Sequence, residues 1–159
     1  MMTELEGQPF ALNGQAELLA FPSGDTVRIL LDSRASGRAL TVLDCTHVPG
    51  PTEGHMHTDA HKSVFVLAGR YRFRIGEGFV DAAPGDQVFI PRGVAHDFVV
   101  GREGGRALFV FAPAGIEEYF RQLALLGEAG SSSASVDELK RLHHIEPPTP
   151  VPVVLEADS

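Results

Sequence analysis

The segment Gly85-Asp-Gln-Val-Phe-Ile-Pro-Arg-Gly-Val-Ala-His96 decides how this chain is interpreted. Five residues separate its first glycine from Pro91, and two separate Gly93 from His96. Glycine allows a tight turn and a close backbone approach, whereas proline fixes φ at the end of a strand. The segment therefore predicts a short apolar strand, then a turn, and then a histidine at the start of the next strand.

An earlier segment, Gly50-Pro-Thr-Glu-Gly-His-Met-His57, places two histidines two residues apart. Side chains at i and i+2 of an extended strand project from the same face, so His55 and His57 can offer two imidazoles to one ion. Imidazole ligands suit Zn, Fe, Ni, Cu or Mn. A pair of this kind is by itself also typical of solvated strand histidines, and it gains weight from the later segment that ends at His96.

Short apolar and β-branched runs continue on both sides of these segments, from about Ala16 to Pro113, and turn-forming residues separate them. Short, evenly spaced strands are typical of a sandwich or barrel, which makes the expected fold class all-β. The expected strands are Glu17–Phe21, Thr26–Leu31, Ala39–His47, Ser63–Ala68, Tyr71–Ile75, Gln87–Ile90, His96–Val100 and Ala107–Phe111.

The pattern changes after the barrel segment, about 16–113, where apolar residues recur at three- and four-residue spacing. This periodicity predicts helices over about 115–127 and 135–144 that pack on the barrel, the second beginning at a capping box from Ser135 to Glu138. Two consecutive prolines end the second helix. The tail, 147–159, is interpreted as either an arm laid on a partner subunit or a loose end.

Length, composition and charge limit the function classes. The 159 residues, 43% hydrophobic and 21% charged, are typical of one globular domain spanning 1–159. A formal net charge of −8 disfavours a polyanionic partner, so we expect no nucleic acid. The sequence has no apolar run of about 18 residues and no leader-like start, so we expect no membrane partner and a cytoplasmic location. The lone Cys45 is interpreted as a small buried hydrophobe.

Together, the two histidine segments resemble the two sequence motifs of the cupin superfamily, and the likeness covers about Ala39 to Phe111. The chain is similar to small, single-domain, quercetinase-like cupins. This resemblance implies a cupin double-stranded β-helix, or jelly-roll barrel, that holds a divalent transition metal (Fe, Zn, Ni, Mn or Cu) at its mouth. Carried over to this chain, the resemblance implies His55, His57 and His96 as the metal ligands.

The chain departs from the cupin pattern at the position of the usual glutamate ligand. Counted back from Gly69, that position holds Lys62, which is preceded by His61. An ammonium group cannot bind a metal, so the site has either three histidines and open positions or His61 as a fourth ligand. Strand alternation favours Lys62 pointing inward, but a break of register in the preceding turn would bring His61 inward instead.

Lys62 and His61 are therefore the two candidate catalytic residues. A lysine beside a cation in an apolar barrel should have a depressed pKa, which would suit a general base, a Schiff-base amine or a donor to an anionic substrate. Alternatively, Lys62 extends to the barrel rim and only occupies an abandoned ligand position. Glu53 and Asp59 flank the histidine pair and are expected to be solvated loop residues.

The resemblance implies a metal-dependent enzyme of dioxygenase type, acting on a small organic molecule. The many phenylalanines of the expected barrel suit an aromatic or polyketide-like substrate. Two alternatives stay open: a redox-neutral cyclase or isomerase, in which Lys62 or His61 moves a proton, and a small-molecule binding module without turnover. Cupins of this kind commonly pair through their outer strands, so the resemblance also implies a homodimer.

Overall fold

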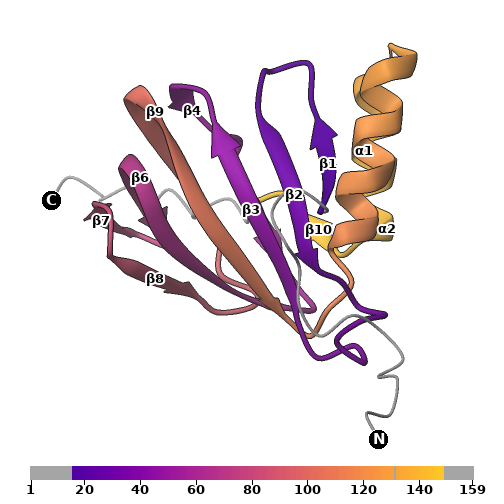
Figure 1. The fold of residues 1–159 in the computed structure, drawn as a ribbon, viewed down its shortest axis with the longest axis horizontal. Coiled ribbons are helices and arrows are strands. Elements are labelled where there is room, and N and C mark those ends of the chain that lie inside the picture. The colour runs from indigo at the N-terminus through magenta and orange to yellow at the C-terminus, as the bar shows by residue number, and fades with distance from the viewer. Residues whose placement is uncertain (1–15, 131, 149–159) are drawn as a thin grey trace, which may run out of the picture.

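The computed structural model describes residues 16–130 and 132–148, which form a β-rich fold followed by two helices (Figure 1). The helices are α1 (Glu117–Ala129) and α2 (Ser133–Leu142). The strands are β1 (Glu17–Ala20), β2 (Thr26–Leu31), β3 (Thr41–His47), β4 (Gly50–Pro51), β5 (Met56–His57), β6 (His61–Ile75), β7 (Gly78–Ala82), β8 (Gln87–Ile90), β9 (His96–Ala112) and β10 (Ile145–Glu146).

Eight strands form one antiparallel sheet with the main order β1-β2-β3-β9-β6-β7, to which β4 and β8 are attached through β9 and β6. The long strands β6 and β9 take part in both halves of this sheet. The first part of β9 pairs with β4 and the end of β6, whereas its last part pairs with β3 and the start of β6. Register shifts in β6 between Val66 and Ala68 and between Gly69 and Tyr71 let the strand bend.

The bend brings the two halves of the sheet together around an aromatic core. Phe98 from one half and Phe109 and Phe111 from the other are buried. The rings of Phe98 and Phe109 meet edge to face, with centroids 6.0 Å apart. Side chains alternate along each strand, so Phe65 lies on the opposite face and is exposed. The inner face is therefore rich in phenylalanine, and it carries the histidine site described below.

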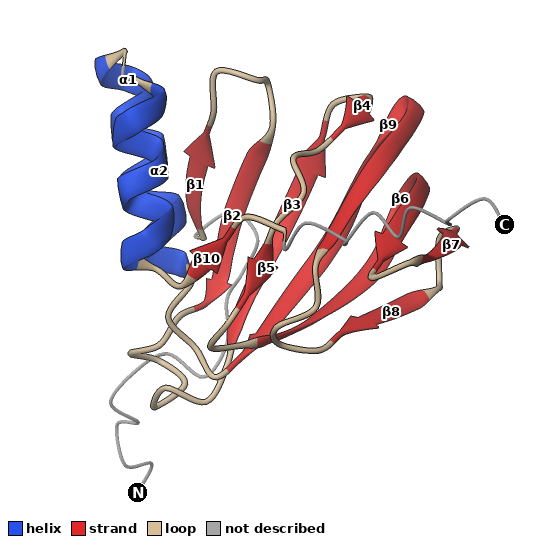
Figure 2. Ribbon diagram, turned by 180° about the vertical axis from the view of Figure 1, so that it is seen from behind, coloured by secondary structure: helices blue, strands red, loops and turns tan. Residues whose placement is uncertain are grey.

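Glu117 fixes α1 to the sheet. Its Oε1 accepts a hydrogen bond from the Ser33 N–H at 2.8 Å, and its Oε2 accepts from the Thr41 hydroxyl at 2.6 Å and the Gly115 N–H at 3.0 Å. Burial raises the pKa of this carboxyl, but these hydrogen bonds outweigh burial and hold the pKa below its usual value. The helix is thereby held beside β1 at one edge of the sheet (Figure 2).

The end of the chain returns to the histidine segment. After α2, β10 pairs antiparallel with β5, which sets Ile145 opposite His57 and Glu146 opposite Met56. The Thr58 N–H also donates a hydrogen bond to the His144 carbonyl at 3.0 Å. The β5–β10 pair is a separate two-stranded sheet, and β10 lies next to the helices in Figure 2. The C-terminal segment therefore pairs with the short strand that ends at His57.

The predicted all-β class with two C-terminal helices is confirmed, and β2 and β8 have the predicted bounds. Two pairs of strands that were predicted as separate are each one long strand. The first pair, Ser63–Ala68 and Tyr71–Ile75, forms β6, and the second, His96–Val100 and Ala107–Phe111, forms β9. The β6 bulges and the glycine-rich centre of β9 bend the chain without ending its pairing. The strands β4, β5, β7 and β10 were not predicted, and three of them have only two residues.

The predicted start of the second helix was also wrong. α2 begins at Ser133, and Ser132 is its N-cap, with a side chain that accepts from the Ser135 N–H at 3.3 Å. The capping box predicted at Ser135 therefore lies inside the first turn. The tail beyond residue 148 lies outside the described residues. Within residues 16–130 and 132–148, no helix is long and apolar enough to cross a membrane.

Candidate metal centre

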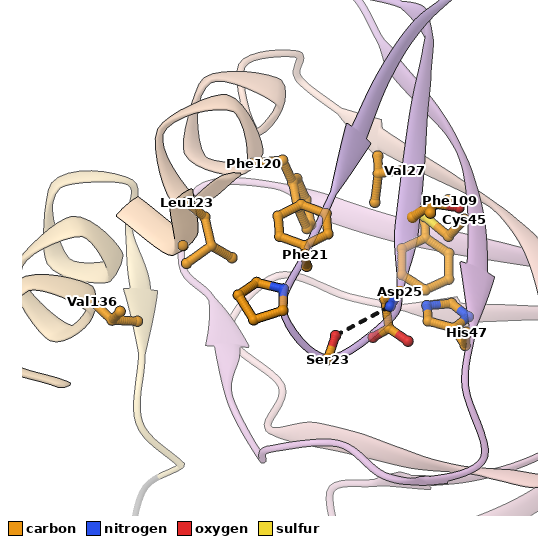
Figure 3. Close-up of a pocket in the computed structure, with 13 residues that line it drawn as sticks. Phe21, Ser23, Asp25, Val27, Cys45, His47, Phe109, Phe120, Leu123 and Val136 are labelled. Atoms are coloured by element: carbon orange, nitrogen blue, oxygen red, sulfur yellow. Dashed lines mark hydrogen bonds between the residues drawn. The ribbon is translucent and has the colours of Figure 1, made fainter. Parts of the chain in front are cut away.

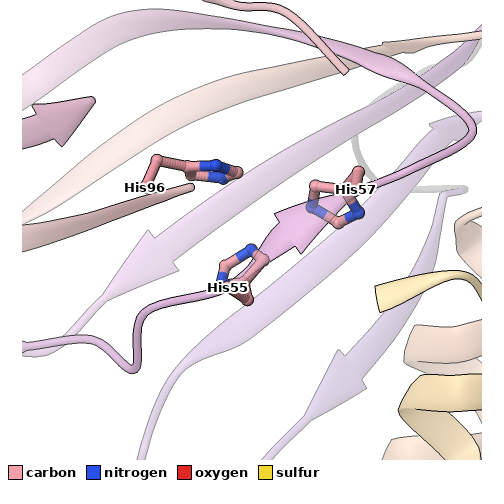
Figure 4. Close-up of side chains that lie close together, drawn as sticks. All are labelled: His55, His57 and His96. Atoms are coloured by element: carbon pink, nitrogen blue, oxygen red, sulfur yellow. The ribbon is translucent and has the colours of Figure 1, made fainter. Parts of the chain in front are cut away.

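Three histidines from the two sequence segments meet inside the fold (Figure 4). His55 precedes β5, His57 ends it, and His96 begins β9. A β-bridge joins His55 to His96. In this bridge the His55 N–H donates to the His96 carbonyl at 3.0 Å, and the His96 N–H donates to the His55 carbonyl at 2.8 Å. Backbone pairing therefore sets the relative position of two of the three side chains.

The three imidazoles are close enough to share one ion. One ring nitrogen from each histidine lies within 4.8 Å of the others. Two nitrogens that bind one metal at about 2.1 Å lie no more than about 4.2 Å apart, so the rings would move inward when a metal binds. His57 Nδ1, His57 Nε2 and His96 Nε2 are buried and have no hydrogen-bond partner among the described residues. Buried polar atoms are normally partnered, so these nitrogens fit the donor set of a bound metal.

Backbone carbonyls orient two of the rings. His55 Nδ1 lies 3.0 Å from the Glu53 carbonyl, and His96 Nδ1 lies 3.0 Å from the Val94 carbonyl. A carbonyl oxygen only accepts, so each Nδ1 carries the proton and each Nε2 keeps a free lone pair. Metal-binding histidines commonly have this kind of outer partner, which fixes the tautomer and the ring orientation. The ring of His57 instead packs edge-on against Phe111, with centroids 5.1 Å apart.

All three imidazoles are held in the neutral form that binds metals. Burial, followed by the nearby charge of Lys62, lowers the pKa of His55 to about 4, of His57 to about 2 and of His96 to about 3. Protons therefore do not compete for these nitrogens near neutral pH.

Lys62 points inward, as strand alternation favours, and its side chain is buried. Its Nζ lies over the ring of Phe109, 4.2 Å from the centroid, and within 5.8 Å of the Phe98 centroid and 5.6 Å of the Phe111 centroid. No ion pair or hydrogen bond of this ammonium occurs among the described residues. Burial lowers the Lys62 pKa to about 8. The barrel therefore holds an amine supported by aromatic faces.

His61 lies apart from the cluster. Its Nδ1 accepts a hydrogen bond from the Arg92 N–H at 3.1 Å, and its ring packs on Phe89, with centroids 5.6 Å apart. Phe89 is half exposed, and the adjacent Lys62 is buried, so His61 occupies the outer face of β6. The turn before β6 does not break the alternation, and the structure does not bring His61 together with the other three histidines.

Among the described residues, no carboxylate joins the three histidines. Glu53 is exposed and forms an ion pair with Lys140 at 2.7 Å. Asp59 is exposed in the turn before β6, and Asp97, which follows His96, pairs with Arg74. The cluster is thus a three-imidazole set, and the buried Lys62 occupies the position where the resemblance to cupins leads us to expect a carboxylate.

A cavity of about 320 Å³ adjoins the cluster, and His55, His57 and Lys62 are among the residues that line it. Sequence reasoning missed several other lining residues, among them Tyr119, Lys140 and Ile145. These side chains come from α1, α2 and β10, and no local sequence signal indicates that the C-terminal segment returns over the barrel. His47 was missed as well, although it follows the buried Leu43 and Cys45 at the alternation that marks the inner face of β3.

Comparison with known proteins agrees with the geometry. The model of the cupin domain family matches residues 45–111, which include all three histidines and Lys62. No curated protein sequence matches the chain.

Several solved structures are similar to this one. KdgF from Halomonas sp. is 16% identical with a TM-score of 0.62, over 70% of this chain and 98% of that one. An RmlC-like cupin from Shewanella frigidimarina is 20% identical with a TM-score of 0.61, over 72% and 99%. Pac13 from Streptomyces, described as a nucleoside dehydratase, is 15% identical with a TM-score of 0.55, over 68% and 84%. At these identities, the similarity shows the shared fold.

Proposed function

The chain belongs to the cupin superfamily, and on that premise we propose that it is a metal-dependent enzyme acting on a small organic molecule. His55, His57 and His96 would hold one divalent transition metal. The observation that carries the proposal is the set of three converging imidazoles with buried nitrogens that lack other partners. A bound metal would act there as a Lewis acid that polarises an oxygen of the substrate.

The chain's own groups indicate the kind of substrate. Lys62 presents a buried ammonium to the cavity, and the aromatic faces of Phe98 and Phe109 flank it. An ammonium has only donors, so it would bind an anionic or enolic oxygen of the substrate. A flat aromatic or conjugated body would fit against the phenylalanine rings. The proposed substrate is thus an aromatic or polyketide-like molecule with an acidic hydroxyl, an enol or a carboxylate.

Two reaction types are compatible with such a site. The dioxygenase type would add both atoms of O₂ to the substrate, and it follows from the likeness to quercetinase-like cupins. The second type is redox-neutral, as in an isomerase or a cyclase, and Lys62 favours it. An amine with a pKa of about 8 can take and return a proton near neutral pH.

Oxygen consumption separates the two reaction types. Protein loaded with Fe(II), Ni(II), Mn(II) or Zn(II) would be incubated with aromatic hydroxy-ketones and keto acids, while an oxygen electrode and mass spectrometry follow the reaction. Uptake of one O₂ per product supports the dioxygenase, and a product of unchanged or dehydrated mass without O₂ uptake supports the redox-neutral enzyme. Unaltered compounds with every metal would contradict the enzyme and leave a binding module.

A further inference from the structure

His47 lies between two adjoining cavities. It lines the cavity next to the three histidines, and it also lines a second cavity of about 320 Å³ that extends under α1 (Figure 3). Three aromatic rings hold its imidazole: centroid distances are 5.1 Å to Phe98, 5.4 Å to Phe109 and 5.6 Å to Tyr71. The ring is therefore fixed in place at the junction of the two cavities.

Tyr71 determines the tautomer of His47. The Tyr71 hydroxyl lies 2.8 Å from His47 Nδ1, and it has no other hydrogen-bond partner among the described residues. A phenol that is buried from water needs an acceptor for its proton, and Nδ1 is the acceptor within reach. Burial raises the pKa of Tyr71, so the phenol keeps that proton. Nδ1 therefore accepts, and the imidazole proton is on Nε2.

The Nε2–H of His47 is left for a ligand. No hydrogen bond or ion pair of this nitrogen occurs within the described ranges, and Nε2 does not belong to the fully buried, unpartnered atoms. Burial lowers the pKa of His47 to about 4, so the ring stays neutral and its single free donor persists near neutral pH. His47, which lines the cavity that also contains Lys62, thus carries an N–H donor without a partner among the described residues.

Asp25 restricts what His47 can bind. Asp25 lines both cavities and lies beside His47 in Figure 3, with Oδ1 accepting from the Val48 N–H at 2.8 Å. This carboxylate disfavours a second anion at the His47 end, whereas Lys62 favours an anion at the other end. A neutral acceptor, such as a carbonyl oxygen, is therefore favoured over an anion at His47.

We propose that His47, with Tyr71 as its positioning residue, is a second substrate-binding point that donates Nε2–H to a neutral carbonyl of the ligand. This inference rests on the proposed function of the same cavity and narrows its substrate class. The ligand is an aromatic molecule that carries an anionic or enolic oxygen for Lys62 and a separate carbonyl for His47, as in aromatic keto acids and hydroxy-ketones.

Long-range ¹H–¹⁵N NMR of the imidazole nitrogens tests the tautomer in the metal-free protein. The expected result is an Nε2–H tautomer of His47 in the wild type and a mixture of tautomers in Tyr71→Phe. An Nδ1–H tautomer in the wild type would overturn the proposal, because Nε2 would then be an acceptor.

Matched ligands test the donor function. The probes are phenylpyruvate against 3-phenylpropionate, and 4-acetylbenzoate against 4-ethylbenzoate, so that each pair differs mainly by one carbonyl oxygen. We expect the wild type to bind at least one carbonyl probe about 3- to 10-fold more tightly than its partner, which is the usual net contribution of one hydrogen bond. A wild type with no such preference in either pair overturns the proposal.

The variant His47→Phe/Tyr71→Phe separates a binding role from a structural one. Replacing both members of a buried hydrogen-bonded pair with apolar rings of similar shape has little effect on stability, whereas His47→Phe alone leaves the phenol unpartnered. We expect the double variant to regain the stability lost in His47→Phe but not the preference for the carbonyl probe. A double variant that keeps the preference would overturn the proposal.

The same titrations distinguish this inference from the proposed function. They are run on metal-free and on Zn(II)-loaded protein. If the protein binds no metal but prefers the carbonyl probe, the proposed metal-dependent function is contradicted and the proposed role of His47 is supported. If the protein binds metal but shows no preference for the carbonyl probe, with or without Zn(II), the proposed role of His47 is contradicted and the proposed function is not.

Discussion

His55 and His96 are joined by reciprocal backbone hydrogen bonds of 3.0 and 2.8 Å, although they lie 41 positions apart in the sequence. The pairing comes from the main chain, so it does not depend on a metal. Two of the three imidazoles therefore start from positions set by the fold, and an ion would order the rings rather than assemble the segments.

We expect the metal-free protein to keep the His55–His96 bridge. After treatment with EDTA, the amides of both residues should still exchange slowly with solvent, because each donates to the other's carbonyl. Hydrogen exchange followed by NMR measures this, with the amide of the exposed Asp59 as a fast-exchanging control. Rapid exchange of both histidine amides without metal would show that the site forms only on metal binding.

Lys62→Met should stabilise the protein at neutral pH. The folded-state pKa of about 8 lies below the usual 10.5, so the folded state disfavours the ammonium. This penalty is fully present below pH 8 and is relieved as the pH rises toward 10.5, where the unfolded chain also loses the proton. A shift of this size corresponds to about 2–4 kcal/mol.

Urea unfolding at pH 7 and at pH 10 measures the Lys62 effect. Lys62→Met should gain stability at pH 7 and little at pH 10. Lys140→Met is the matched control, since its ion pair with the exposed Glu53 should contribute no more than about 1 kcal/mol. A Lys62→Met protein that is less stable than the wild type at pH 7 would show that the ammonium has a partner in solution.

Acid should destabilise the metal-free protein below about pH 6.5, the ordinary histidine pKa. His47, His55, His57 and His96 have folded-state pKa values of about 4 or lower, so the unfolded chain binds more protons than the folded chain as the pH falls below that value. Each such histidine contributes a slope of about 1.4 kcal/mol per pH unit until its folded-state pKa is reached.

Denaturant unfolding between pH 7 and pH 4.5 measures this slope. His57→Leu should lower the slope by about 1.4 kcal/mol per pH unit, which is the contribution of one proton. His144→Asn is the matched control variant, because His144 is exposed and its φ of 59° suits asparagine. Equal slopes in the wild type and His57→Leu would contradict a neutral, buried His57.

Gly69→Ala should either unfold the chain or lower the free energy of unfolding by more than about 4 kcal/mol. A Cβ at Gly69 would lie 2.1 Å from the Gly104 carbonyl oxygen and 2.8 Å from the Gly105 Cα, both backbone atoms at the bend between β6 and β9. Gly76→Ala is the matched control: φ is +57° against +78° at Gly69, but nothing lies within 4 Å. The control should cost only the left-handed penalty of about 1–2 kcal/mol, and thermal unfolding compares the two. Equal costs would show that the two strands are not packed this closely.

Much of the fold and of the site could be predicted from local sequence. The spacing of Gly85, Pro91 and His96 and the pair His55 and His57 are short-range patterns that resemble the cupin motifs, and this resemblance implied the barrel and its three histidines. Alternation also favoured the inward position of Lys62 and left His61 as the alternative, and the structure shows Lys62 buried. These features depend on the backbone geometry of single strands.

The rest depends on contacts between distant segments. The strand β10 has only two residues, and its pairing with β5 leaves no mark in either stretch of sequence. Lys140 and Ile145 reach the cavity only through that return of the chain. The hydrogen bond from Tyr71 to His47 likewise joins two strands of the barrel, so the local sequence does not distinguish His47 from other strand histidines.

The most direct measurement is the metal content of tag-free protein, determined by elemental analysis after exchange into metal-free buffer and addition of one metal at a time. We expect about one equivalent of a transition metal per chain in the wild type, and a near-complete loss in His96→Ala. His61→Gln and His144→Asn should keep the wild-type content, because neither side chain lies with the three imidazoles. Wild-type protein that retains no Fe(II), Zn(II), Ni(II) or Mn(II), or His96→Ala that retains as much metal as the wild type, would contradict the three-histidine centre.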